Sequence, residues 1–61
     1  MPRPKKKFGS HFYTYYDGYM GKNEAEKSSR EFRYQGYGAH VEHVVEDYHY
    51  PWKLWIRKLK R

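Results

Sequence analysis

Histidine and carboxylate side chains, which can ligate metal ions, cluster in one stretch of the chain that reads AHVEHVVEDYHY. On a helix, His40, His43 and Asp47 would share one face, where such side chains hold Zn²⁺ or iron. Glu46 and His49 have the Glu-x-x-His spacing of di-iron bundles, but such a site needs a second helix of this kind and two more glutamates. We therefore favour a solvated helix face, keep the three residues as metal candidates, and expect no cofactor.

Catalytic nucleophiles are not supported by this sequence. Nucleophilic catalysis needs a hydroxyl or thiol beside a base, and a third group that orients the base. The chain has no cysteine, and the neighbours Ser10 and His11 have no recognisable third partner. A catalytic pocket also needs walls, and 61 residues form one small core at most. We predict a protein that is not an enzyme and takes no small-molecule substrate.

The positive charge is concentrated at the two ends of the chain. Thirteen Lys and Arg against seven Asp and Glu give a net charge of +6. Residues 1–7 carry four cations and residues 51–61 carry five, whereas residues 8–50 carry four cations and all seven acids. Two basic ends predict contact with an anionic surface, either RNA or phospholipid. The predicted anion-binding residues are Arg3, Lys5, Lys6, Lys7, Lys53, Arg57, Lys58, Lys60 and Arg61.

The first third of the chain predicts an extended arm and a short hairpin. Residues 1–7 contain two prolines and three consecutive lysines, which oppose a helix. Residues 8–21 are rich in aromatic side chains, which favour a strand. Asp17 and Gly18 form a typical turn pair, so we expect the hairpin to reverse there.

A polar helix is predicted over residues 23–35. Asn23 is suited to cap its first turn, and Gly36 is suited to end it. The run Phe32-Arg33-Tyr34 fits either the end of this helix or a strand.

Two further segments repeat apolar side chains at helical spacing, i, i+3, i+4 and i+7. In residues 39–50 these are Val41, Val44, Val45 and Tyr48, and in residues 51–61 they are Trp52, Trp55, Ile56 and Leu59. We favour a helix over strand for the first segment, and predict a basic amphipathic helix for the second. The eight side chains are the predicted protein-docking residues, because Tyr, Trp and aliphatic anchors dominate protein interfaces.

These elements predict a small mixed α+β fold that is mostly helical and open. Val, Leu, Ile and Phe number only nine, about 15% of the chain, below the ~20% typical of chains that fold alone. We therefore expect marginal stability in isolation, completed by a partner surface.

The sequence favours a non-enzymatic accessory subunit of a larger assembly, which docks on other proteins and places its basic ends on RNA or an anionic membrane. One alternative is a free-standing nucleic-acid-binding protein, such as a viral or phage protein. A second alternative is a small His/carboxylate metal-binding protein. Because no apolar stretch resembles a secretory signal, we expect an intracellular location, with a mitochondrion or similar organelle as one option.

Overall fold

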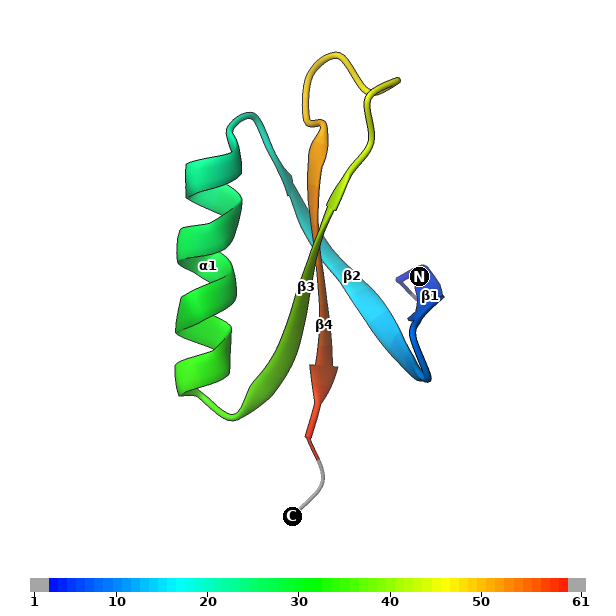
Figure 1. The fold of residues 1–61 in the computed structure, drawn as a ribbon, viewed down its shortest axis with the longest axis vertical. Coiled ribbons are helices and arrows are strands. Elements are labelled where there is room, and N and C mark those ends of the chain that lie inside the picture. Colours follow the sequence, from blue (N-terminus) through cyan, green and yellow to red (C-terminus); the bar gives the residue numbers. More distant parts are fainter. Residues whose placement is uncertain (1–2, 60–61) are drawn as a thin grey trace.

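The computed structural model describes residues 3–59, which form a four-stranded antiparallel sheet with one helix packed on one face (Figure 1). The elements in chain order are β1 (Lys5–Phe8), β2 (His11–Tyr19), α1 (Lys22–Tyr34), β3 (Tyr37–His43) and β4 (Trp52–Lys58). Their order in the sheet is β1-β2-β4-β3, and every neighbouring pair is antiparallel. The last strand of the chain is therefore a central strand.

The prediction of a mostly helical and open fold is wrong. The segment 51–61, predicted as a helix, contains the strand β4. Because β4 is central and covered on both faces, it carries the consecutive apolar residues Leu54, Trp55 and Ile56. A short apolar run of this kind satisfies helical spacing as well as strand geometry, so periodicity alone cannot separate the two.

The helix favoured for residues 39–50 is also absent, because this segment contains the end of β3 and a loop. In β3, Ala39 and Val41 lie opposite Ile56 and Leu54 of β4. The residues between them point to the other face of the sheet, since side chains alternate along a strand. The β-branched valines suit this pleated surface better than they suit a helix.

The hairpin predicted within residues 8–21, with its turn at Asp17-Gly18, is wrong, because β1 and β2 form the N-terminal hairpin instead. β1 and β2 are joined by Gly9 and Ser10, with Phe8 opposite His11. Gly9 has a φ of 64°, a value that favours glycine at the first position of a tight hairpin turn. Asp17 and Gly18 lie instead inside β2, just after an irregularity that shifts its register against β4.

The predicted polar helix is confirmed as α1. It begins at Lys22 after Gly21, which provides no side-chain cap, so the predicted capping by Asn23 does not occur. It ends at Tyr34, and Gly36 follows with a φ of 91°. This left-handed residue is the usual way to end a helix, because glycine adopts it without steric strain.

The hydrophobic core is small and divided between the two faces of the sheet. Among the described hydrophobic residues, only Ala25, Leu54 and Trp55 are buried. Ala25 of α1 and Leu54 of β4 are 0% exposed. Burial raises the pKa of Tyr19, which hydrogen-bonds Ser28 of α1.

The sheet curls until side chains of its two edge strands meet on the face opposite α1. The ring of Phe8 in β1 stacks on His40 of β3, with 4.1 Å between their centroids. Phe8 also makes an edge contact with Trp55, at 5.6 Å. The Phe8 side chain of β1 therefore covers Trp55 as a lid, and aromatic side chains form a second layer on this face of the sheet.

Candidate binding surfaces

Three cations alternate along the first described residues and lie on one face of the β1–β2 hairpin. Lys5 lies opposite Thr14, and Lys7 lies opposite Phe12, so these four side chains share a face. Arg3 extends the row, and its guanidinium donates to the carbonyl oxygen of Tyr16 at 2.6 Å. The cations and the exposed ring, Arg3, Lys5, Lys7 and Phe12, are here called the basic hairpin face.

The aromatic side chains beside this row differ in their accessibility. Phe12 is 65% exposed, and the Lys7 ammonium lies over its ring, 5.9 Å from the centroid. Tyr16 is packed edge-on against Phe32 of α1, with 4.7 Å between centroids. Tyr16 is 39% exposed, so Phe12 is the more accessible of the two rings.

Lys6 points away from the basic hairpin face. Its ammonium pairs with the Glu42 carboxylate at 2.5 Å, on the face that β1 closes over. All three lysines are exposed, but alternation along the strand places Lys6 on the other face, where it pairs with Glu42.

The described C-terminal cations, Lys53, Arg57 and Lys58, do not form a second basic face of the same kind. Lys53 pairs with Asp47, and Arg57 lies over the Tyr13 ring at 5.8 Å. The Arg57 Nε is buried without a hydrogen-bond acceptor in the described structure. Lys58 is exposed at the end of β4. Lys60 and Arg61 lie outside the described residues.

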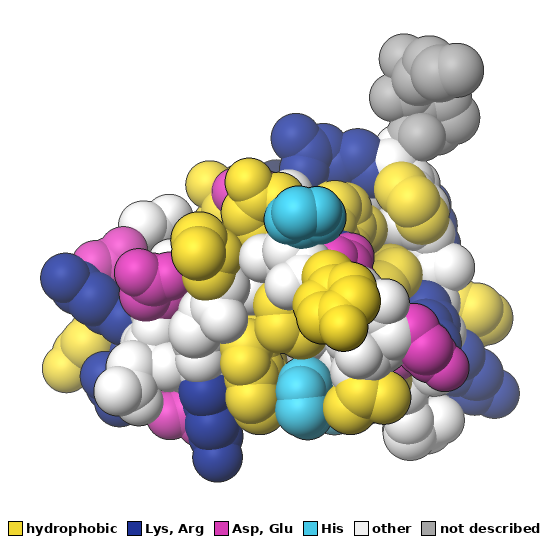
Figure 2. All heavy atoms as spheres, turned by 90° about the horizontal axis from the view of Figure 1, so that it is seen from above, with side chains coloured by type: hydrophobic (Ala, Val, Ile, Leu, Met, Phe, Trp, Pro, Cys, Tyr) yellow, Lys and Arg dark blue, Asp and Glu magenta, His cyan; other side chains and the backbone are white. Residues whose placement is uncertain are grey.

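An apolar surface occupies the end of the molecule where the β3–β4 loop and the β2–α1 connection lie. Met20, Val45, Tyr48 and Tyr50 are 72%, 74%, 96% and 51% exposed. Figure 2 views this end of the molecule and shows hydrophobic side chains gathered at its centre, with most charged side chains around them. These four residues are here called the apolar tip.

The loop that presents the apolar tip is held by Asp47. One carboxylate oxygen accepts hydrogen bonds from the backbone amides of His49 and Tyr50, at 3.1 and 2.9 Å. The other oxygen binds the Lys53 ammonium. The Lys53 hydrogen bond and these amides lower the pKa of Asp47 to about 2, and the same carboxylate raises the pKa of Lys53. The hydrogen bonds and the ion pair of the Asp47 carboxylate therefore hold the loop in place.

The predicted docking residues fall into an interior group and an exposed group. Trp55 is 8% exposed, and Val41 and Ile56 are half-buried beneath α1, so these side chains serve the chain's own core. Trp52 stacks on His43 at 4.0 Å, and Val44 is half-buried. Leu59, Val45 and Tyr48 are exposed, at 38%, 74% and 96%.

The predicted metal candidates are not brought together. His40 stacks on Phe8, whereas His43 stacks on Trp52, which lies on the opposite face of the sheet. Asp47 is engaged with Lys53 in the loop. Within residues 3–59, no group of three or more His, Asp or Glu side chains is arranged to hold a metal ion.

Three accessible residues were not among the predicted site residues: Phe12, Met20 and Tyr50. Phe12 lies in a stretch, residues 8–21, that contains no Lys or Arg, so its sequence neighbours give no sign of a cationic partner. The pair Gly9-Ser10 was the available signal, since a two-residue turn there places Lys7 opposite Phe12.

No protein-family model matches the chain, and no curated protein or solved structure matches it either. The one helix of the described chain, α1, is too short and too polar to cross a bilayer.

Proposed function

We propose that the chain is a non-enzymatic accessory protein that binds an anionic polymer through the basic hairpin face. The observation that carries this proposal is the row of Arg3, Lys5 and Lys7. In residues 3–59, no Asp or Glu forms an ion pair with any of these three side chains. Unpaired cations in a row produce a positive potential along the strand, which attracts a polyanion more strongly than scattered charges do.

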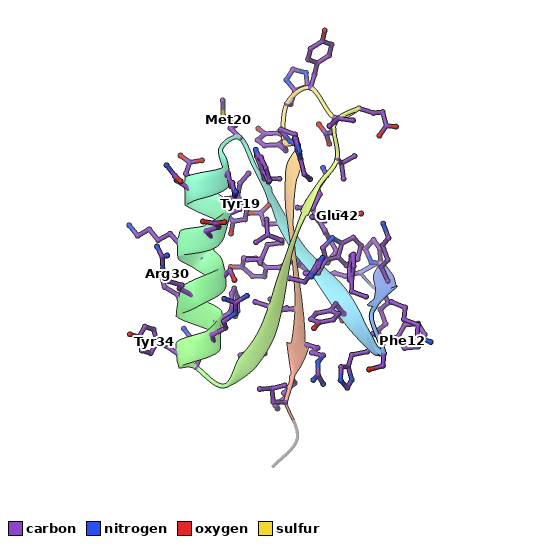
Figure 3. All side chains as sticks on the ribbon, viewed as in Figure 1. Phe12, Tyr19, Met20, Arg30, Tyr34 and Glu42 are labelled. Carbon is purple, nitrogen blue, oxygen red and sulfur yellow. The ribbon has the colours of Figure 1, made fainter. Side chains whose placement is uncertain are left out.

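Charge-matched variants and heparin test this proposal. The double variant Lys5→Gln/Lys7→Gln should elute from heparin at clearly lower salt than the wild type. The matched control Lys27→Gln/Arg30→Gln removes the same charge from α1, whose exposed Arg30 points away from the hairpin (Figure 3). Equal elution of the two double variants would show that only net charge matters, and the proposal would be wrong.

The apolar tip favours a second activity of the same protein, docking on another protein subunit. Exposed Tyr, Val and Met side chains gathered at one end resemble the apolar centre of an interface more than ordinary surface. A photo-crosslinking side chain at Tyr48 should join the native protein to one defined partner. The same side chain at Tyr34, which is 91% exposed on α1, is the control. Identical crosslinked products from both positions would contradict docking at the tip.

A further inference from the structure

We infer that the basic hairpin face binds single-stranded nucleic acid, with a base stacked on Phe12 and phosphates beside Arg3, Lys5 and Lys7. This inference rests on the proposed function, because it names the polymer that this face takes. It combines two features that single-strand binding requires, an accessible aromatic ring and cations that follow the backbone.

The cations are spaced for a linear polymer. Lys5 and Lys7 alternate along β1 and lie opposite Thr14 and Phe12 of β2. Alternate residues on a strand are about 7 Å apart, so the charges form a line parallel to the strand. A line of this kind suits successive phosphates on an extended chain, whereas a single small anion would need charges that converge on one point.

Phe12 supplies the contact that distinguishes a nucleic acid from other polyanions. Its ring is 65% exposed and lies within 5.9 Å of the Lys7 ammonium, so a stacked base would bring its phosphate close to that cation. Every base has a flat π face, which makes such stacking tolerant of sequence. A sulfated or phosphorylated polymer without bases gains nothing from this ring.

The same ring favours a single strand over a duplex or a membrane. Bases in a duplex are stacked on each other and cannot reach a protein ring, whereas bases in a single strand are free to do so. Membrane insertion gains from several large apolar side chains on one face, whereas here Phe12 is 65% exposed and Tyr16, which packs against α1, is 39% exposed.

Fluorescence anisotropy with a labelled single-stranded oligonucleotide tests the inference. Phe12→Leu should weaken binding about fivefold or more, the effect expected for the loss of one base–ring stack. Phe12→Trp should bind at least as tightly as the wild type, because a larger ring stacks better. Tyr34→Leu is the matched control, since Tyr34 is an exposed ring on the far side of the molecule (Figure 3), and its affinity should stay at the wild-type value.

Binding measurements with three other ligands distinguish a failure of this inference from a failure of the proposed function. Heparin should bind wild type and Phe12→Leu equally, which also shows that the variant hairpin is intact. The duplex of the same sequence, and vesicles of anionic phospholipid, should bind more weakly than the single strand.

Equal oligonucleotide binding by wild type and Phe12→Leu, or preferential binding of the duplex or the vesicles, would overturn the inference. The proposed function would survive these results if heparin binding still depended on Lys5 and Lys7. Failure of the wild type to bind any of the four ligands would overturn both.

Discussion

Lys6 and Glu42 form an ion pair of 2.5 Å between the two outer strands of the sheet, although β2 and β4 lie between those strands. The second Glu42 oxygen accepts a hydrogen bond from the Trp55 indole at 3.0 Å. One carboxylate therefore connects β1, β3 and β4 and holds the sheet in its curled shape. The lid formed by β1 depends on this contact and on the stacking of Phe8 on His40.

Replacing Glu42 by glutamine should loosen the lid. The variant keeps the shape of the side chain but weakens both charge-assisted hydrogen bonds, so we expect a loss of about 1–2 kcal/mol in the free energy of unfolding. Urea unfolding followed by tryptophan fluorescence measures this, because Trp55 lies directly at the contact. Glu46→Gln, at an exposed position in the β3–β4 loop, should change stability little. Similar losses in both variants would show that the Glu42 contact is unimportant.

The two leucines provide a matched test of the core. Leu54 is 0% exposed and Leu59 is 38% exposed. Leu54→Ala should lower the free energy of unfolding by about 2–5 kcal/mol, since it leaves a cavity between α1 and the sheet. That is a large part of the roughly 3–9 kcal/mol expected for a domain of this size. Leu59→Ala should cost less than about 1 kcal/mol. Circular dichroism during thermal unfolding compares them, and equal melting temperatures would contradict the assigned core.

Acid should release the apolar tip before it unfolds the sheet. Asp47 has a pKa of about 2 in the folded protein, below its value of 3.8 in a free side chain. A lowered carboxylate pKa stabilises the fold above the unfolded value, and this contribution is lost as the pH falls from about 4 to 2. Protection of the His49 and Tyr50 amides from exchange, relative to their intrinsic rates at the same pH, should therefore fall in that window. Asp47→Asn should show fast exchange already at neutral pH, and unchanged rates in that variant would refute the role of the carboxylate.

The same substitution at two glycines should have opposite effects. A side chain at Gly9 or Gly21 would meet no other atom within 4 Å, so space does not distinguish them. Gly9 has a φ of 64°, which strains any residue with a Cβ, and Gly9→Ser should cost about 1 kcal/mol.

Gly21 precedes α1 with a φ of −122° and offers no side-chain cap. Gly21→Ser should therefore gain roughly 0.5 kcal/mol as an N-cap. For a chain of this length, 1 kcal/mol shifts the melting temperature by about 4–8 °C, so thermal unfolding resolves the difference. Shifts of the same sign would contradict the backbone assignment.

Part of the fold could be predicted from local sequence signals. The helix α1 was predicted within one residue at each end, because charged residues at helical spacing are followed by Gly36, whose φ of 91° ends the helix. The extended character of Lys5–Lys7 was also predictable, since prolines precede these lysines.

The candidate site was harder to predict from the sequence, because it depends on which residues lie opposite one another in the sheet. The lysines were identified as anion-binding residues, yet the sequence contains no sign that Lys6 pairs with Glu42, 36 positions away. Phe12 gained its cationic neighbour only through the register of β1 against β2. Trp55, predicted as a docking anchor, is a core residue that the Phe8 ring of β1 covers.

The sequence by itself determined the helix α1, the basic N-terminal segment and the scarcity of aliphatic residues, since each depends on composition or on neighbours along the chain. Only the tertiary structure decided that residues 37–43 and 52–58 are strands. Their apolar residues fit helix and strand spacing alike, and a strand requires hydrogen-bonding partners from distant segments. The same pairing of distant segments decided which cations remain exposed and which rings are buried.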